Sequence, residues 1–406
     1  MATDIQRGGP APAWPPIGSE RRQWHGDADS GRSRRAELNA RGPYEAAVPP
    51  SISTLRLPQL DDETVVAAED AAIDLGRFDG EVGAIAAPFS AILLRSESAA
   101  SSEIEQLTAS AKNIALAELG RRAGPNSRLI VGNVRAMEAA IDMAEDLDTS
   151  TIIAMQAEIL RDDQPEHTGR WRDQQVWIGG DYSNSPHTAS FVPPHHDRVP
   201  KLMEDLVAFA RRTDLPALPQ IAIAHAQFET VHPFPDGNGR TGRALIQAML
   251  HRLGVTRNVT VPVSAGLLRS TRGYFDALTA YRAGDVEPII RALAEGSSDA
   301  IANGRHLVAD LTAIRSRWES ATSARAGSAG RRLLDVLQRQ PVIDARLASS
   351  ELQLSARNAQ NGIDRLVEDG ILHQIGAGER GRAYEAREVL NALDEFAARA
   401  RRSRAR

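Results

Sequence analysis

The nine residues HPFPDGNGR, His232 to Arg240, lie between two segments whose apolar side chains recur at helical spacing. In the preceding segment, PQIAIAHAQFET, this spacing places Ile221, Ala224 and Phe228 on one face. The following segment, TGRALIQAMLHRL, has the same period. The chain is therefore constrained here to a helix, a tight loop and a second helix. Such a loop ends at a helix N-terminus, where unpaired backbone N–H groups and the helix dipole favour an anion.

Several residues of this segment suit a phosphate ligand. Gly237 and Gly239 permit backbone conformations that bring N–H groups close to an anion, and Asn238 tolerates them too. Arg240 and Arg243 lie three residues apart at the start of the following helix, so both guanidinium groups can face bound phosphates. We therefore predict that the loop binds phosphate.

Three more side chains give the loop chemistry beyond anion binding. Asp236 is a hard oxygen ligand of the kind that holds Mg²⁺. His232 titrates near neutrality and suits a general base, and Phe234 is expected to point inward as an anchor. Each of these residues alone is also typical of an ordinary loop, so the prediction depends on the combination. The segment lacks the Gly-Lys-Ser/Thr of a Walker loop and a second histidine at zinc-ligand spacing.

The composition narrows the class of protein. A chain of 406 residues, 42% of them hydrophobic, is long enough for two or three domains with buried cores. The longest apolar run, 82–94, is too short for a membrane helix, and the N-terminus lacks the features of a secretory signal. We therefore expect a soluble, cytoplasmic protein with no membrane contact. The absence of cysteine excludes disulfides, Cys-ligated zinc and thiol catalysis.

Helical spacing dominates the chain from Tyr44 onward. The clearest stretches are 63–75, 104–119, 129–147 and 203–210. In contrast, residues 1–42 are rich in Pro, Gly and Arg, and they are expected to form a disordered arm. The segment WRDQQVWIGG, 171–180, predicts one or two short strands, because it is rich in the strand formers Trp171, Val176, Trp177 and Ile178.

The C-terminal part has the pattern of a winged helix-turn-helix. Short helices are predicted at 333–337, 345–352 and 356–367, with Ser355 as the cap of the third and Gly370 beyond its end. The segment ILHQIGAGERGRAYEA then predicts a strand, a glycine turn and a strand. In this interpretation 356–367 is the recognition helix, and Arg357, Asn358 and Gln360 are candidates to contact DNA bases. A winged helix that binds only protein is the alternative.

A family resemblance rests on the central motif. His232, Phe234, Asp236, Gly237, Asn238, Gly239, Arg240 and Arg243 match H-x-F-x-[D/E]-G-N-G-R-x-x-R, so the chain resembles the Fic family. The resemblance extends to HAQFET, GRWRDQQVWIGG and FVPP, and to YEAAVPPSI near Tyr44, and covers roughly 43–300. It implies a mainly α, Fic-type helical bundle with a short β-hairpin flap, followed by the α+β winged helix-turn-helix. The expected order is a disordered arm (1–42), an N-terminal helical region with an inhibitory helix (43–125), the catalytic core (126–300), a linker helix (301–330), the winged helix (331–390) and a basic tail (391–406).

The resemblance also implies a reaction. A protein of this family would transfer AMP from ATP to a Ser, Thr or Tyr hydroxyl of a protein target, including itself, with Mg²⁺ as cofactor. His232 would take the hydroxyl proton, and Asp236 would hold Mg²⁺. Gly237, Asn238 and Gly239 would form the anion hole, Arg240 would bind the polyphosphate and Arg243 the γ-phosphate. A flap containing Trp171, Val176, Trp177 and Ile178 would hold an extended target segment by backbone pairing.

Alternative functions stay open at this point. The same pocket could transfer phosphate or remove AMP, and the chain could instead be a DNA-binding regulator that uses the pocket as a nucleotide sensor. The sequence names neither the target protein nor a DNA site, and it leaves a homodimer open.

The segment SSEIEQ, 101–106, resembles the inhibitory motif of the same family, [S/T]-x-x-x-E-[G/N], with Ser101 and Glu105 in place. The resemblance implies that Glu105 pairs with Arg243 and competes with the γ-phosphate, since a carboxylate can occupy the same guanidinium fork. Gln106 departs from the motif, because glutamine does not favour the left-handed conformation of Gly or Asn. The alternative is a capping box, in which Ser102 and Glu105 stabilise a helix start.

Overall fold

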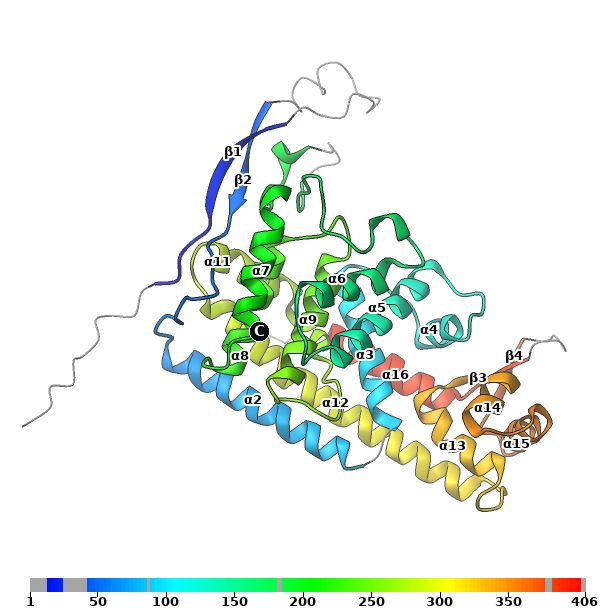
Figure 1. Ribbon diagram of the computed structural model, residues 1–406. Helices are drawn as coiled ribbons and strands as arrows, with labels where there is room; N and C mark the ends of the chain where they lie inside the picture. Colours follow the sequence, from blue (N-terminus) through cyan, green and yellow to red (C-terminus); the bar gives the residue numbers. More distant parts are fainter. Residues whose placement is uncertain (1–12, 25–41, 86–87, 181–184, 377–381, 403–406) are drawn as a thin grey trace, which may run out of the picture.

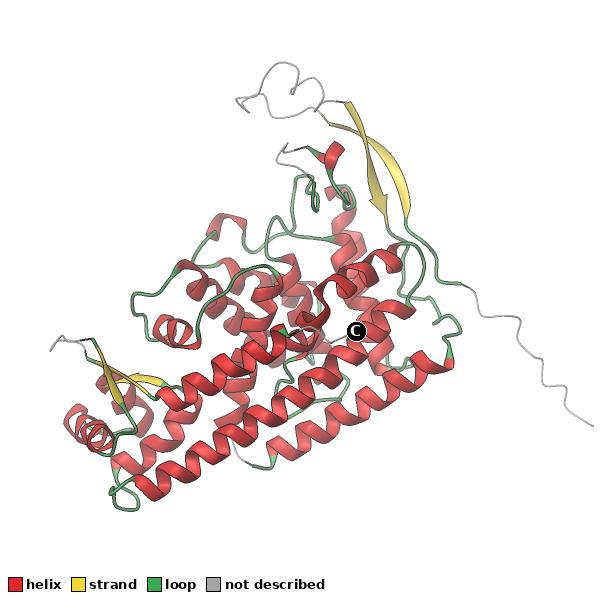
Figure 2. Cartoon of the chain, turned by 180° about the vertical axis from the view of Figure 1, so that it is seen from behind, coloured by secondary structure: helices red, strands yellow, loops and turns green. Residues whose placement is uncertain are grey.

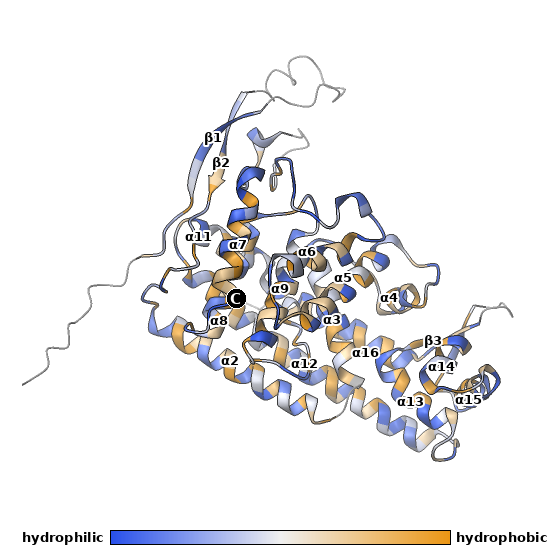
Figure 3. Ribbon diagram, in the orientation of Figure 1, coloured by the Kyte–Doolittle hydropathy of each residue, from blue (hydrophilic) through white to orange (hydrophobic). Residues whose placement is uncertain are grey.

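The computed structural model describes residues 13–24, 42–85, 88–180, 185–376 and 382–402. In these residues the chain is mainly helical, as expected, with one sheet of two strands and one of three (Figure 1). The long helices α2 (Asp62–Gly83) and α12 (Glu287–Ala321) lie side by side and cross the molecule (Figures 1 and 2). Both carry hydrophilic and hydrophobic residues in alternation along their length (Figure 3), which is typical of helices with one buried face.

The core surrounds helices α8 (Ala217–Val231) and α9 (Asn238–Arg252), in which nearly every residue is buried. They correspond to the two helices predicted on either side of the HPFPDGNGR loop. Around them pack α5 (Pro125–Asp142), α6 (Thr149–Leu160), α7 (Val199–Ala210), α10 (Val263–Leu267) and α11 (Thr271–Arg282). Short 3₁₀ helices cover 165–167, 186–188, 196–198 and 268–270. No helix in the described residues is both long and apolar enough to cross a membrane.

The expectation of a disordered arm over 1–42 is wrong for residues 13–24. Strand β1 (Gly18–Trp24) pairs antiparallel with β2 (Gly42–Val48) along its whole length. Trp14 is buried against Phe209 and Tyr281. The segment is therefore anchored to the helical core, although it contains few apolar residues of its own. Residues 1–12 and 25–41 lie outside the described residues.

The helix predicted over 104–119 is also wrong, because the chain breaks between α3 (Pro88–Ile104) and α4 (Ala111–Glu118). The N–H of Leu107 donates to the Ser102 carbonyl at 3.0 Å and that of Gln106 to the Glu103 carbonyl at 2.8 Å. This pair of bonds is a Schellman motif, and Gln106 takes the required left-handed conformation with φ of 62°. Glu105 therefore lies at the end of a helix, and the capping-box alternative is wrong.

The three helices and two strands predicted for the C-terminal part occur in the predicted order, and a strand at 342–344 and a helix at 387–401 occur in addition. They are α13 (Ala329–Arg339), β3 (Val342–Asp344), α14 (Ala345–Leu352), α15 (Ala356–Glu368), β4 (His373–Ile375), β5 (Ala383–Glu385) and α16 (Arg387–Arg401). The strands form an antiparallel sheet in the order β3-β5-β4. Ser355 caps α15 as predicted, and the turn between β4 and β5 falls largely on 377–381, outside the described residues.

Two of the expected domain boundaries, after residues 300 and 390, fall inside continuous helices. Helix α12 runs through residue 300 without a break, so the segments expected as a catalytic core and a linker share one helix. Residues 391–401, expected as a basic tail, belong to α16, because their apolar side chains are buried and their arginines have partners. Arg399 donates to Asn303 Oδ1 at 2.7 Å, and Arg401 pairs with Glu103. Residues 403–406 lie outside the described residues.

Close backbone contact between α10 and α12 gives a stability prediction. A Cβ atom at Gly266 would lie 1.8 Å from the carbonyl oxygen of Gly296, whereas one at Gly80 on the exposed face of α2 would meet nothing within 4 Å. We expect Gly266→Ala to reduce the free energy of unfolding by about 1–3 kcal/mol through overpacking. Gly80→Ala, the matched control, should raise it by about 0.5–1 kcal/mol. Thermal melts followed by circular dichroism would measure both, and equal melting temperatures would contradict the predicted contact.

Candidate active site

The loop 232–237 joins α8 and α9, in which nearly every residue is buried. His232 ends α8 in a left-handed conformation, with φ of 48°, and its N–H donates to the Phe228 carbonyl at 2.8 Å. Gly237, with φ of 82°, precedes the first residue of α9. The Asn238 side chain closes the loop, because its Oδ1 accepts from the Phe234 N–H and its Nδ2 donates to the Phe234 carbonyl, both at 2.9 Å. The loop is thus held by both helices and by its own side chains.

A pocket opens over this loop. It brings together seven of the residues singled out in the sequence: Glu105, His232, Asp236, Gly237, Asn238, Gly239 and Arg240. Pro235 and four residues that sequence reasoning did not identify, Leu107, Leu129, Asp163 and Gln164, complete the lining. Phe234 is fully buried beneath it, with its ring 5.0 Å from that of Trp171. Arg243 lies behind the pocket wall and is 1% exposed.

Arg240 offers free donors to an anion in this pocket. Its side chain is buried, and Nε and Nη1 have no hydrogen-bond partner among the described residues. The nearest carboxylate oxygen, Asp236 Oδ1, is 3.8 Å from Nη2. Because a buried polar group without a partner is costly, these donors fit a phosphate that would satisfy them.

Asp236 is the candidate ligand for a divalent cation. Its side chain is 47% exposed, Oδ1 accepts from the Gly237 N–H at 2.5 Å, and Oδ2 accepts from Gln164 Nε2 at 3.1 Å. The described residues contain no cluster of three or more metal-ligating side chains. One protein carboxylate completed by phosphate oxygens and water is a common way to bind Mg²⁺, so the donor set fits Mg²⁺ bound together with a nucleotide.

The candidate inhibitory residues contact Arg243 directly. Arg243 Nη2 donates to Glu105 Oε1 and to the Ser101 carbonyl, each at 2.8 Å, and Nε donates to Ser101 Oγ at 2.9 Å. Burial opposes the charge of Arg243, but Glu105 raises its pKa overall. A Cβ atom on Gly239 would lie only 2.0 Å from Glu105 Oε1. The Glu105 carboxylate therefore occupies the start of α9, where an anion would bind.

The expected strands at 171–180 are wrong apart from one bridge. Ile178 and Phe191 exchange two backbone hydrogen bonds, of 2.9 and 3.2 Å. The other candidate flap residues lie in irregular chain and pack individually: Trp171 against Phe234, and Trp177 against Trp24 of β1 with ring centroids 5.5 Å apart. Val176 is half-buried. The strand propensity of residues 171–180 is outweighed by these individual side-chain contacts, which hold the segment in an irregular conformation.

Burial and the charged side chains around His232 set its protonation. Burial, reinforced by Arg172, lowers the pKa of the His232 imidazole to about 4, so that the ring is neutral at pH 7. Burial raises the pKa of Glu229, whose Oε2 is 3.9 Å from His232 Nδ1, to about 7. Sequence reasoning missed Arg172 and Glu229 because both occur in segments interpreted for their apolar residues. The signal that could have identified these two residues is a charged side chain within a segment that is otherwise expected to be buried.

Comparison with known proteins identifies the central domain. Residues 146–250 match the Fic/DOC family. This segment is a Fic/DOC domain. Protein adenylyltransferase fic-1 from Caenorhabditis elegans is 29% identical over 161 residues, which cover 39% of this chain and 28% of the relative. Protein adenylyltransferase Fic from Nematostella vectensis is 30% identical over 157 residues, covering 38% and 33% of the two chains.

The chain is thus related to protein adenylyltransferases, but the match spans a third or less of the length of these relatives. A crystal structure of a Fic family protein from Desulfovibrio desulfuricans superposes with a TM-score of 0.51 at 21% identity. The superposition covers 83% of this chain and 98% of the other. At this identity the likeness concerns the fold, and it confirms the expected Fic-type, mainly helical architecture.

The raised pKa of Glu229 predicts a pH dependence of stability. A carboxyl group whose pKa is higher in the folded than in the unfolded state contributes stability below the unfolded value, near 4.5, and loses it as pH rises through about 7. We therefore expect the melting temperature of Glu229→Gln to fall less between pH 5 and pH 8 than that of the wild type, by several degrees. Glu81→Gln, at an exposed ion pair with Arg305, is the control and should keep the wild-type slope. Parallel curves for all three proteins would contradict this assignment.

Proposed function

We propose that this Fic/DOC protein transfers AMP from ATP to a Ser, Thr or Tyr hydroxyl of a protein. The observation that carries the proposal is the pocket over the loop, where a neutral imidazole, a hard oxygen ligand and an arginine with free buried donors surround a helix N-terminus. The relation to protein adenylyltransferases supports this reaction over other uses of the same groups.

In the proposed reaction the hydroxyl oxygen of the target attacks the α-phosphorus of ATP. A new P–O bond forms, the bond from the α-phosphorus to the bridging oxygen of the β-phosphate breaks, and diphosphate leaves. His232 accepts the hydroxyl proton, because its imidazole is neutral at pH 7. The backbone N–H groups at the start of α9 and the Arg240 guanidinium stabilise the phosphate charge. Mg²⁺, bound through Asp236, would neutralise the polyphosphate.

The Glu105–Arg243 pair supports inhibition of this activity by the chain itself. The carboxylate accepts from Arg243 and lies against Gly239, so ATP and Glu105 would compete for the same donors. Glu105 directly follows the last residue of α3, so the end of this helix places its carboxylate against Arg243. Release of the glutamate would leave Arg243 free for the γ-phosphate.

The bridge between Ile178 and Phe191 supports docking of an extended target. The Val192 carbonyl, next to Phe191 in the chain, accepts from the Ala47 N–H of β2 at 3.0 Å. The bridge is therefore connected to the β1–β2 hairpin. A target segment could add beyond Ile178 by backbone pairing, with its hydroxyl directed towards His232.

Substitution of Glu105 tests the proposed activity and its inhibition together. We expect Glu105→Gly to raise self-labelling from ATP carrying the label on the α-phosphate by about ten- to hundredfold, because a charge-assisted hydrogen bond of about 1.5–3 kcal/mol is lost. His232→Ala in the Glu105→Gly background should abolish the labelling. Gel autoradiography and the mass of one added AMP provide the measurement.

The position of the label separates the alternatives. Transfer of label from the γ-phosphate would instead indicate phosphotransfer, and loss of AMP from a modified target without ATP would indicate AMP removal. Equal labelling of wild type and Glu105→Gly would refute the inhibitory role.

We also propose that residues 329–401 form a winged helix-turn-helix that binds DNA and regulates the pocket. The element order and the exposure of Arg357 and Asn358 on α15 support the first part, while Gln360 is engaged with Asp364 and Tyr384. Contacts of α16 on both sides of Glu105 support the regulation of the pocket. Glu103 pairs with Arg401, and Asp394 accepts from the N–H of Ala111 at 3.0 Å. Helix α16 thus holds both ends of the inhibitory turn.

Loss of the α16 contact should weaken inhibition partially. We expect Arg401→Ala to raise self-labelling by about two- to fivefold, less than Glu105→Gly, because a partly exposed ion pair contributes up to about 1 kcal/mol. Arg317→Ala, which removes an exposed pair with Glu388 on the opposite end of α16, is the control and should label as the wild type does. Quantified α-phosphate labelling of the full chain compares the three.

The same assay with double-stranded DNA tests the proposed partner. Duplex DNA should bind with an affinity that falls as salt rises and should change the labelling of the wild type but not that of Glu105→Gly. Absence of binding, or binding that leaves the labelling of the wild type unchanged, would refute the regulatory role of DNA.

A further inference from the structure

We propose that Arg172 is a positioning residue that fixes the backbone of His232 and joins it to the target-docking flap. This role rests on the proposed function of His232 as the base. Arg172 comes from the flap segment, sixty positions before His232 in the chain, and its side chain is 3% exposed. Among the described residues no carboxylate pairs with its guanidinium, whose hydrogen bonds go to backbone carbonyls.

The guanidinium binds the catalytic loop from one side. Nε donates to the His232 carbonyl at 2.8 Å, Nη2 contacts the Val231 carbonyl at 3.4 Å, and the backbone N–H donates to the Pro233 carbonyl at 2.9 Å. Three consecutive peptide units are therefore held by one residue. The left-handed conformation of His232 is unfavourable for a residue with a side chain, so it needs such external support.

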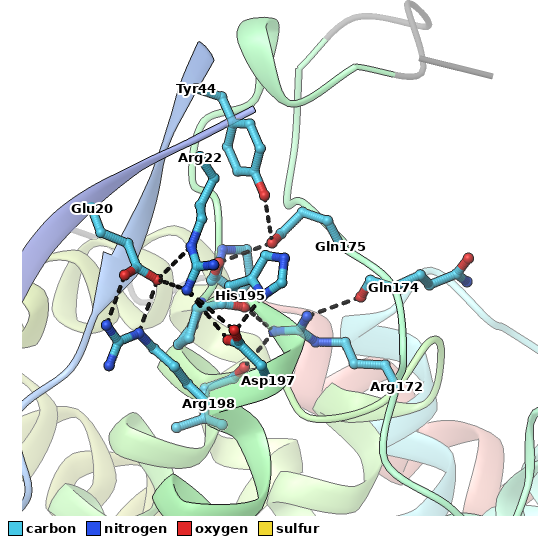
Figure 4. A network of polar contacts seen from close by, with 12 residues as sticks. Glu20, Arg22, Tyr44, Arg172, Gln174, Gln175, His195, Asp197 and Arg198 are labelled. Carbon is cyan, nitrogen blue, oxygen red and sulfur yellow. Dashed lines mark hydrogen bonds and ion pairs between the residues drawn. The ribbon is translucent and has the colours of Figure 1, made fainter. Parts of the chain in front are cut away.

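The other side of the guanidinium binds the flap. Nη1 donates to the Gln174 carbonyl at 3.0 Å, and Nη2 donates to the Pro194 carbonyl at 2.5 Å. Figure 4 shows Arg172 beside Gln174, with Gln175 leading to Tyr44 of β2. The Tyr44 hydroxyl donates to Gln175 Oε1 at 3.0 Å, and Gln175 Nε2 donates to the Pro193 carbonyl at 2.9 Å. Arg172 is thus the junction between the flap, the chain before α7 and the loop that carries His232.

The same network extends to the N-terminal hairpin. Glu20 of β1 accepts from Arg198 and from Arg22, and Arg22 also contacts Asp197 (Figure 4). Residues 193–198 therefore lie between the hairpin and Arg172. A target that binds the flap would act on the backbone of His232 through Arg172, which links target docking to the alignment of the base.

Arg172 also has an electrostatic effect on His232. The charged groups that face the imidazole come from four elements: Glu229 from α8, Glu105 from the end of α3, Arg282 from α11 and Arg172 from the flap. After burial, Arg172 is the strongest cause that keeps the pKa of His232 low. Loss of this cation should shift the pKa of His232 upward, towards the ordinary value near 6.5. A residue that only stabilised the fold would have no such effect.

The test compares two substitutions in the Glu105→Gly background of the full chain. Arg172→Met removes the charge and all donors, whereas Arg172→Lys keeps the charge with a single nitrogen that cannot span both sides. We expect Arg172→Met to lower kcat for AMP transfer by about tenfold to hundredfold, since small misplacements of a reacting group cost that much. Affinity for an ATP analogue should stay within about twofold, because Arg172 lines no part of the nucleotide pocket.

An NMR titration of the His232 ring, assigned by comparison with His232→Ala, gives a readout independent of turnover. Its midpoint should rise in Arg172→Met and stay low in Arg172→Lys, while kcat falls in both. Arg212→Met is the matched control, because Arg212 likewise donates to the backbone carbonyls of Ser53 and Leu55 but lies away from the pocket. It should change neither quantity.

The outcomes separate this proposal from the proposed function. If the Glu105→Gly protein transfers no AMP, the proposed function fails, and the titration still tests the contact between Arg172 and His232. An unchanged titration midpoint or an unchanged kcat in Arg172→Met would overturn the positioning role. If Arg172→Met does not fold, Arg172→Lys decides the question through kcat, and wild-type kcat in that variant would refute the role.

Discussion

The buried guanidinium of Arg243 is the interaction on which the site depends. A charge with 1% exposure needs an anionic partner, and here the partner is Glu105, helped by the hydroxyl and carbonyl of Ser101. Removing the partner leaves an uncompensated buried charge beside the start of α9. That position therefore attracts whichever anion reaches it, and this is the physical basis on which a nucleotide phosphate and the glutamate would compete.

Competition between Glu105 and a phosphate requires a fixed position of the Glu105 carboxylate at the start of α9. The Schellman motif at the end of α3 does this, because it forces Gln106 into a left-handed conformation and turns the chain away after one residue. Glutamine has no special preference for that conformation, so the hydrogen bonds of Leu107 and Gln106, and the Glu105–Arg243 pair, must offset the strain. Gly239 completes the arrangement, since a side chain there would collide with the carboxylate.

Sequence reasoning predicted the parts of the site that are local in the chain. The residues from His232 to Arg240 follow one another closely, so their order in the chain indicated that they share one loop, and the apolar period identified α8 and α9. The parts that depend on distant contacts were missed. Residues 18–24 form a strand because they pair with β2, and the chain just before them is anchored by the buried Trp14. The helix expected over 104–119 breaks because Ser110 caps α4 and Leu107 closes α3. Arg172 functions through carbonyls some 20 and 60 residues away, and no sequence pattern records such partners.

Segments from the two opposite ends of the chain make polar contacts that lead to the pocket. The N-terminal hairpin and the flap reach His232 through Arg172, whereas α16 reaches Glu105 through Glu103 and Ala111. The first set of contacts holds the backbone of His232, whereas the second holds Glu105, which lies at the anion site and also faces the His232 imidazole. Loop 232–237 and the start of α9 lie between them and are held rigidly by Asn238 and the surrounding core. In the proposed function, target docking and inhibition would therefore be controlled from separate parts of the chain and would meet at the charges around His232.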